Sequence, residues 1–352
     1  MIQLDGNWGE GGGAIVRVAL ALSTLTGKAF RVDNIRKGRE KPGLKAQHLH
    51  CIKALQELCD AKATDAHIGS ESITYVPGQI KPKNLNIDIG TAGSITLLLQ
   101  AVLLPCLFGE KASRIKVTGG TDVAWSMPFD YFNSVLVPQL RKYVQIDVKL
   151  ERRGYYPKGG GKVNIKIKPK FIFSDLNDAP PINLTEQGEL VKINGIVHCS
   201  SSLARHNVAE RIVQSAQLYL GGLSVPKEVT SEYSETASTG TGIVLIARYS
   251  SGDSFKDEFN PVILGTDQLG EKTKTSEKVG EEASLQLLDE INSGDAVDKH
   301  LADNLIPYLA IFGGRVQTSK ITDHTLTNIY VCEKFLGIKF EIDEEKGMIS
   351  VV

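Results

Sequence analysis

The first residues that could carry chemistry lie in the segment DGNWGEGGGAIVRVAL, residues 5–20. Its glycines, Gly11–Gly13, precede an apolar stretch with helical spacing, and backbone amides at such a turn can bind phosphate. The segment lacks the lysine of a Walker loop and the spacing of a dinucleotide-binding fingerprint, so a strand-to-helix turn explains the glycines better on their own. Glu10 and Arg17 change this balance, because Mg²⁺ held by the Glu10 carboxylate would bridge it to phosphate oxygens.

A basic loop occupies residues 35–50, IRKGREKPGLKAQHLH, where Pro42 and Gly43 predict a turn rather than a helix. Clusters of this kind usually form a solvated surface. Arginine, however, has a planar fork that suits bidentate contacts to phosphate. The loop therefore also predicts a local site for a phosphorylated end, and its cations are Arg36, Lys37, Arg39, Lys41 and Lys45.

The last predicted helix begins near His324, in the segment ITDHTLTNIYVCEKFLG of residues 321–337. Thr322 and Asp323 are both suitable residues for its N-cap. A single histidine is more often structural than catalytic, but backbone amides at a helix N-terminus can hold a phosphoryl group. An imidazole at this position could therefore attack phosphorus.

Residues 154–163, GYYPKGGGKV, predict a β-hairpin with a bulge. Two tyrosines also precede Lys158 and Lys162, and aromatic side chains next to cations are typical of surfaces that bind nucleobases. The sequence leaves both interpretations of this hairpin open.

The composition indicates a globular protein without a general affinity for polyanions. The 352 residues include 40 lysines and arginines against 41 acidic residues, a net charge of −1, so any polyanion site must be local. The five scattered cysteines contain no C-x-x-C pair, which argues against a disulfide framework or a zinc cluster and favours a cytoplasmic location. No secretory signal opens the sequence, and the longest apolar run, residues 94–109, is too short for a bilayer. We therefore expect a buried helix there and no membrane partner.

An internal repeat occurs three times along the chain. Each copy has a small-residue opening, an apolar helix, a glycine stop, a short strand, a polar loop and a second amphipathic helix. About a hundred additional residues separate the second copy from the third, enough for an inserted domain. The glycine stops are Gly27, Gly109 and Gly313.

These elements predict an α/β (α+β) fold with mixed sheets. We expect residues 1–184 to hold the first two repeats, residues 185–278 the inserted α/β domain, and residues 279–352 the third repeat. The segment 168–189, rich in proline, aspartate and asparagine, is predicted to be the linker that leads into the insert.

Seven segments, in order from the first strand to the last helix, closely resemble the RNA 3'-terminal phosphate cyclases. They are LDGNWGEGGGAIVR, IRKGREKPGLKAQHL, GTAGSITLLLQ, GGTD, GYYPKGGG, HLADNL and DHTLTN. The resemblance implies three repeats of a four-stranded sheet with two helices around a pseudo-threefold axis, and a smaller α/β domain inserted before the third repeat. The repeats and the insert found in the sequence agree with this arrangement.

The resemblance also implies an activity, the ATP-dependent conversion of an RNA 3'-terminal phosphate into a 2',3'-cyclic phosphodiester. His324 is then the nucleophile that attacks the α-phosphorus of ATP and carries AMP as a covalent histidyl-AMP. AMP would pass to the RNA 3'-phosphate to give RNA(3')pp(5')A, from which the neighbouring 2'-hydroxyl displaces it. The expected cofactors are ATP as co-substrate and Mg²⁺ or Mn²⁺, and the expected partner is RNA with a 3'-terminal phosphate.

Further site residues follow from the same resemblance. Glu10 matches the acidic metal ligand, and Gln100 matches a polar position near ATP. The resemblance places Arg17, Arg36, Arg39 and Gln47 around the phosphates of ATP or RNA. The segment HLADN would hold the nucleotide, with Asp303 reaching the adenosine; it comprises His300, Leu301, Ala302, Asp303 and Asn304.

Two departures from the family pattern leave the base selectivity open. His300 stands where a tyrosine is common, and Met127 stands where a proline lies next to the base.

Two other function classes compete with this prediction. Cyclase-like factors of ribosome biogenesis share the fold without adenylylation, but they lack the nucleophilic histidine that His324 would supply. Enolpyruvyl transferases repeat a related unit, but without an insert of this type or a DHTLTN helix. The oligomeric state is not determined by the sequence, and a homo-oligomer is compatible with it.

Overall fold

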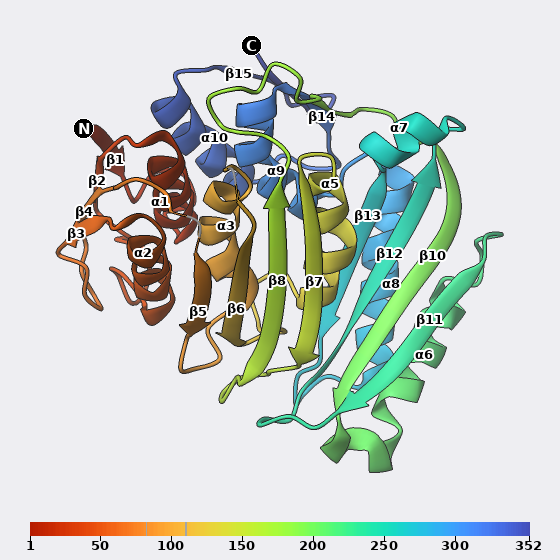
Figure 1. Cartoon of the computed structure of the whole chain (residues 1–352). Helices are drawn as coiled ribbons and strands as arrows, with labels where there is room; N and C mark the ends of the chain where they lie inside the picture. Colours follow the sequence, from red (N-terminus) through yellow and green to blue (C-terminus); the bar gives the residue numbers. More distant parts are fainter. Residues whose placement is uncertain (82, 110) are drawn as a thin grey trace.

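The computed structural model describes residues 1–81, 83–109 and 111–352 (Figure 1). Within these residues the chain forms four mixed four-stranded sheets and ten α-helices, as the predicted α/β class requires. In each sheet one pair of strands is parallel and the remaining pairs are antiparallel. Parallel pairs need a crossover, and helices supply it.

Three of the sheets share one topology, in which the strand order along the sheet is first, second, fourth, third in chain order. The first sheet contains β1 (Ile2–Asp5), β2 (Phe30–Asp33), β4 (Ile73–Val76) and β3 (Lys62–Thr64). The second contains β5 (Asn84–Asp88), β6 (Ser113–Gly119), β8 (Gly161–Pro169) and β7 (Val144–Arg152). The third contains β9 (Ile182–Leu184), β14 (Gly314–Gln317), β16 (Met348–Val351) and β15 (Phe340–Asp343). The repeated order agrees with the sequence repeat, whereas a pseudo-threefold axis stays a prediction.

The helices predicted for each repeat are present. They are α1 (Ala14–Thr26) and α2 (Ala46–Cys59), then α3 (Ile95–Cys106), then α9 (Lys299–Phe312) and α10 (Asp323–Leu336). Helix α1 contacts both α3 and α10, and α10 contacts α9. Because α1 is apolar on nearly all sides, it is buried along almost its whole length.

The second helix of the middle repeat is irregular. It consists of α4 (Phe129–Tyr131), a π-helical turn (Phe132–Leu136) and α5 (Val137–Leu140). A π-turn inside a helix changes which side chains share a face and is often found at functional sites.

The insert has its own sheet and its own hydrophobic core. Its strands are β10 (Glu189–Ser200), β11 (Lys227–Ser234), β12 (Thr241–Ser250) and β13 (Ile263–Leu269), in the order β11–β10–β12–β13. Helices α6 (Val208–Tyr219) and α8 (Ser276–Ser293) cover one face of this sheet, and a 3₁₀ turn (Ser201–His206) and α7 (Ser254–Phe259) complete it (Figure 1). Val279, Ala283 and Leu287 of α8 belong to the insert's core, so α8 packs with the insert.

Two local predictions were wrong. The segment 168–189 is not only a linker, because β9 lies within it and pairs in parallel with β14 of the third sheet. Helix α3 ends at Cys106 with Leu107 as its C-cap, so Gly109 lies beyond the helix. Gly27 and Gly313 do occupy the C-caps of α1 and α9, both with positive φ.

The hairpin predicted at residues 154–163 is confirmed. Residues 154–163 form the end of the β7–β8 hairpin, with a register shift between Leu150 and Arg152. The five cysteines are all buried free thiols. No helix in the described part of the chain is long and apolar enough to cross a membrane.

Candidate active site

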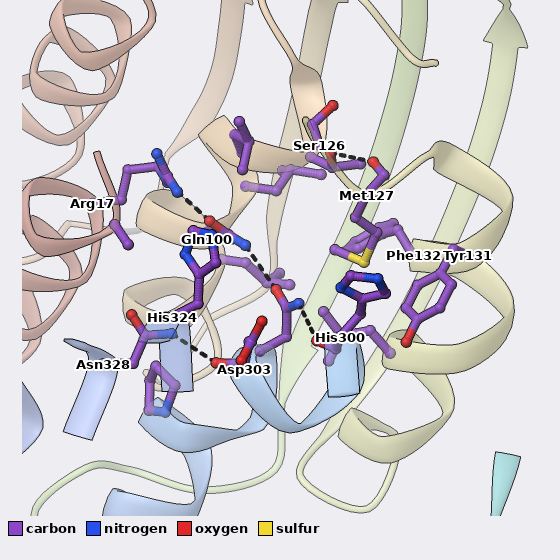
Figure 2. Close-up of a pocket in the computed structure, with 18 of the residues that line it drawn as sticks. Arg17, Gln100, Ser126, Met127, Tyr131, Phe132, His300, Asp303, His324 and Asn328 are labelled. Atoms are coloured by element: carbon purple, nitrogen blue, oxygen red, sulfur yellow. Dashed lines mark hydrogen bonds between the residues drawn. The ribbon is translucent and has the colours of Figure 1, made fainter. Parts of the chain in front are cut away.

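A cavity of about 430 Å³ lies where the helices of the first, second and third repeats meet the insert. Figure 2 shows the side chains that project into it. Arg17 comes from α1, Gln100 from α3, and Met127 from the loop before α4. Helices α9 and α10 contribute His300, Asp303, Asn304, His324 and Asn328, and the insert contributes Asp267, Gln268 and Gln286.

A chain of hydrogen bonds crosses the cavity wall from α1 to α9 (Figure 2). Arg17 Nε donates to Gln100 Oε1 at 2.9 Å, and Gln100 Nε2 donates to Asn304 Oδ1 at 2.7 Å. Asn304 Nδ2 in turn donates to the carbonyl oxygen of His300 at 2.7 Å. These hydrogen bonds fix the orientation of the Gln100 and Asn304 amides. They do not involve the Nη groups of Arg17, which can therefore interact with an anion.

His324 lies in the first turn of α10, as predicted, and its side chain is 50% exposed. Its Nδ1 lies 3.0 Å from Glu10 Oε2. The other oxygen of Glu10 pairs with the guanidinium of Arg39. Glu10 Oε2 is buried and accepts no hydrogen bond within the described residues, so it is free to interact with a protonated Nδ1 or a cation.

The N-terminus of α10 is fixed by a capping box and by α9. Thr322 is the N-cap, and its hydroxyl accepts a hydrogen bond from Thr325 N at 3.1 Å. Both threonine hydroxyls donate to Asp303 Oδ1 at 2.5 Å, and Asn328 Nδ2 donates to Asp303 O at 2.8 Å. Burial raises the pKa of Asp303, while the threonine hydrogen bonds oppose the rise. Asp303 therefore holds the turn that carries His324.

The N-terminus of α9 is held by a buried carboxylate, Asp298. Its oxygens accept hydrogen bonds from His300 N at 3.0 Å and Tyr131 Oη at 2.6 Å. A third bond, from Gly265 N at 2.9 Å, comes from β13 of the insert. Asp298 thus connects three parts of the cavity wall: the start of α9 with His300, the irregular helix with the π-turn, and β13 of the insert.

The glycine-rich turn packs against a buried histidine. A Cβ at Gly13 would collide with His48 Nε2, and a Cβ at Gly12 would collide with the Glu10 carboxylate. His48 Nδ1 accepts a hydrogen bond from Lys45 N at 2.9 Å, so the proton of a neutral ring lies on Nε2. Burial, aided by Arg17 and other cations, lowers the pKa of His48 to about 3. Gly12 and Gly13 therefore lie in close contact with functional side chains, whereas Gly11, with a φ of 59°, is the glycine that the turn itself requires.

The basic loop is a preformed structure. Arg36 Nη1 donates to Lys41 O at 2.8 Å and to Gly43 O at 3.3 Å, which closes the loop on itself. Arg39 reaches from this loop to Glu10. Gln47 Nε2 is buried and has no hydrogen-bond partner within the described residues, so it is a donor available to a ligand.

Some predicted residues lie outside the cavity. Leu301 and Ala302 are fully buried in the core and do not line it. Tyr155 is also buried, and its hydroxyl lies 2.9 Å from His198 Nδ1 of the insert, so it offers no face to a nucleobase. Tyr156 of the same hairpin is exposed, so base stacking by the hairpin stays a prediction.

The sequence did not reveal the contribution of the insert to the cavity. Asp267 lines it from β13, and burial, followed by repulsion from Asp122 and Asp298, raises the pKa of Asp267 to about 7.

Trp125, from the loop before α4, also lines the cavity, and it is 98% exposed. Neither Asp267 nor Trp125 lies in a motif that would have indicated it.

A family model described as RNA 3'-terminal phosphate cyclase matches residues 8–342. The chain belongs to this family. It is 43% identical to the RNA 3'-terminal phosphate cyclase of Pyrococcus furiosus, over 100% of this chain and 99% of that relative. It is 42% identical to the cyclase of Archaeoglobus fulgidus, over 97% of this chain and 98% of that relative. It is also 42% identical to the cyclase of Staphylothermus marinus, over 100% of this chain and 97% of that relative.

Membership of the cyclase family confirms the resemblance drawn from the seven motifs and removes the enolpyruvyl transferase alternative. The motif residues converge in space as well. Glu10, Arg39 and His324 come from three separate motifs, yet they form one contact group.

Proposed function

We propose that this protein converts an RNA 3'-terminal phosphate into a 2',3'-cyclic phosphodiester at the expense of ATP, through histidyl-AMP and RNA(3')pp(5')A. The observation that carries the proposal is the position of His324. It stands at a helix N-terminus, borders a cavity large enough for a nucleotide, and faces Glu10 through Nδ1.

The first step follows from the Glu10–His324 contact. A proton on Nδ1, facing the Glu10 carboxylate, leaves the lone pair of the neutral ring on Nε2. Nε2 attacks the α-phosphorus of ATP, the bond to the β-phosphate oxygen breaks, and pyrophosphate leaves. The imidazolium product carries a positive charge that Glu10 stabilises.

The cavity supplies the nucleotide site in this proposal. Met127 and His300 provide apolar surface for the base, and Asn304 and Asp303 provide polar groups for the ribose. Burial lowers the pKa of His300, which favours its neutral form and is compatible with packing on a base.

Arg17 faces the phosphates, and burial strengthens its interaction with an anion because water is excluded.

Glu10 is also the proposed ligand of Mg²⁺ or Mn²⁺. Its Oε2 carries a second lone pair besides the one that faces His324 Nδ1, and this lone pair fits a hard, oxygen-preferring cation. Such a cation, when bound, neutralises the triphosphate and makes pyrophosphate a better leaving group.

The RNA steps begin from histidyl-AMP. An oxygen of the RNA 3'-phosphate attacks the phosphorus of histidyl-AMP, and the bond to Nε2 breaks. The 2'-hydroxyl then attacks the 3'-phosphorus, loses its proton to water and displaces AMP. Arg36, Arg39 and Gln47 are proposed to bind the RNA phosphate, since Arg39 already reaches the Glu10 carboxylate and Gln47 Nε2 is unpaired.

We also propose a cytoplasmic location, which the five reduced cysteines support.

Cyclisation of a 3'-phosphorylated RNA tests the proposal. Wild type should form the 2',3'-cyclic end with ATP and Mg²⁺, whereas His324→Asn should not. His67→Asn is the matched control, because His67 is exposed and outside the cavity. His324→Asn should still close pre-adenylylated RNA(3')pp(5')A, because the 2'-hydroxyl is the nucleophile in that step. Absence of cyclisation and adenylylation in wild type would favour the non-catalytic assembly factor.

A further inference from the structure

Trp8 and Tyr330 form an aromatic platform beside the candidate active site. Their ring centroids are 4.5 Å apart and their planes differ by 12°, so the two rings are stacked. Trp8 is 38% exposed. The orientation of the Tyr330 ring is fixed by its hydroxyl, which accepts a hydrogen bond from Asp5 N at 3.3 Å. The rings are therefore fixed before any ligand binds.

The platform has a defined position relative to His324. The loop that carries Trp8 runs along α10 in the opposite direction: Glu10 faces His324, and Glu10 N donates to Thr327 Oγ1 at 3.4 Å. Trp8 then lies over Tyr330, six residues along α10 from His324. Six helical residues advance about 9 Å along the axis. This is within reach of the base of a nucleotide whose 3'-phosphate lies at His324.

A lysine and the basic loop lie next to the platform. Lys334 Nζ lies 5.8 Å from the centre of the Tyr330 ring. On the other side, Asn7 Oδ1 accepts a hydrogen bond from Gly38 N at 3.0 Å, which joins the Trp8 loop to the basic loop. An aromatic face beside cations is the combination that binds single-stranded nucleic acid, through base stacking and backbone attraction.

We propose that Trp8, supported by Tyr330, stacks on the 3'-terminal base of the RNA substrate and so positions its phosphate at His324. This inference rests on the proposed function and adds a subsite for the RNA. The platform lies outside the cavity proposed for ATP, so Trp8 contributes to the RNA steps and not to adenylylation. Every base has a stacking face, so the subsite accepts all four terminal bases.

Kinetics with two RNAs test this subsite. One is a short single strand with a 3'-phosphate; the other is identical but abasic at its last nucleotide, with the ribose, 2'-hydroxyl and 3'-phosphate retained. Stacking of a base contributes about 5- to 150-fold in affinity. We expect Trp8→Leu to raise KM for the normal RNA by this factor, leave KM for the abasic RNA unchanged, and leave the rate of adenylylation unchanged.

Trp8→Phe should restore most of the affinity, because it keeps an aromatic face. An equal rise of KM for both RNAs in Trp8→Leu would show a general structural effect and overturn the inference. An unchanged KM for the normal RNA would also overturn the inference. The same holds if Trp8→Leu changes its oligomeric state and its KM stays that of wild type.

Fluorescence provides a readout that does not depend on turnover. The chain has two tryptophans, Trp8 and Trp125, so Trp125→Phe leaves Trp8 as the single emitter. We expect the normal RNA to quench the emission of Trp125→Phe saturably, and the abasic RNA not to quench it. In Trp8→Phe, where Trp125 is the emitter, the normal RNA should cause no such quenching. No quenching at saturating RNA would refute the stacking subsite, whereas lack of cyclisation by wild type would refute the proposed function.

Discussion

Glu10 contacts Arg39 through one carboxylate oxygen and faces His324 through the other. Glu10→Gln keeps the size of the side chain but removes its charge. We expect adenylylation to slow by about 10- to 100-fold, the range of a hydrogen bond to a charged group, and the Mg²⁺ concentration for half-maximal rate to rise. Labelling with α-³²P-ATP over a Mg²⁺ series measures both effects.

Glu40→Gln is the matched control for Glu10→Gln, because Glu40 is an exposed glutamate of the neighbouring basic loop. It should adenylylate like wild type. If Glu10→Gln labels normally at limiting Mg²⁺, Glu10 neither orients His324 nor binds the metal.

His48 gives a prediction for stability against pH. Burial, followed by the cations Arg17, Arg36 and Lys45, lowers its folded-state pKa to about 3, compared with about 6.5 for an unfolded chain. The unfolded state therefore binds an additional proton between these values. This contribution to stability is present above pH 6.5 and is lost as the pH falls toward 3.

Between pH 7 and pH 4.5, the free energy of unfolding of wild type should fall by about 2 kcal/mol more than that of His48→Gln. Urea unfolding at both pH values measures this difference. His67→Gln, at an exposed position, should follow wild type. A His48→Gln protein with the wild-type pH dependence would show that His48 is not buried as a neutral ring.

The sequence predicted the functional role of some residues better than that of others. Glu10 and His324 stood out because an acid beside glycines and a histidine at a helix start are unusual combinations. Their contact joins residues 314 positions apart, which no local pattern encodes. Leu301 and Ala302 were included only because they lie between polar motif residues, and helix geometry turns them into the core.

At the level of elements, the N-terminus of α10 determines where His324 points. Thr322→Ala removes the N-cap and one of the two hydroxyls bound to Asp303. We expect a loss of about 1 kcal/mol in stability and an additional loss of adenylylation of at least tenfold, because the turn that carries His324 loosens. Chemical unfolding and labelling with α-³²P-ATP measure the two effects separately.

The matched control is Thr275→Ala, which removes the N-cap of α8, where the threonine side chain accepts a hydrogen bond from Lys278 N. It should cost a similar amount of stability and leave adenylylation intact. Equal activity of the two variants would mean that the cap of α10 does not position His324.

Long elements with clear periodicity were predictable, and short ones were not. Helices α1, α3 and α10 carry apolar stripes or uniformly apolar sequences, and their starts are marked by glycine or by capping residues. Strand β9 has three residues next to prolines, and its pairing with β14 alone makes it a strand. The π-turn also has no sequence signature, because it depends on how the helix packs against the insert.

On the scale of the whole molecule, a buried charge cluster joins the insert to the second repeat. Arg153 pairs with Asp122 and Asp130 of the second repeat and with Glu232 of the insert. Arg153→Met would leave two buried carboxylates without their cation, at a cost of about 3–5 kcal/mol. We expect a clear loss of stability in urea unfolding.

Arg211→Met is the control, because Arg211 forms an exposed pair with Glu277 on the insert. Its loss should change the stability little, because an exposed ion pair is screened by water and contributes little to folding. Similar stabilities for the two variants would mean that the cluster at Arg153 does not hold the insert in place.

The family and the presence of an insert could be inferred from the sequence, because motif order and spacing survive without knowledge of contacts. The role of the insert could not. Asp267 and Gly265 reach the site from β13 only after the insert docks through Asp298 and Arg153, so the cavity is a property of the assembled chain.

The central claim is that His324 carries AMP, and the most direct test is mass spectrometry of the protein after reaction with ATP and Mg²⁺. The adduct should have the mass of AMP, be labile to acid, and map to the peptide of residues 321–334 on the His324 imidazole. His324→Asn should carry none, while His67→Asn should label like wild type. AMP on any other residue, or a wild-type protein without an adduct under conditions in which it cyclises RNA, would contradict the account.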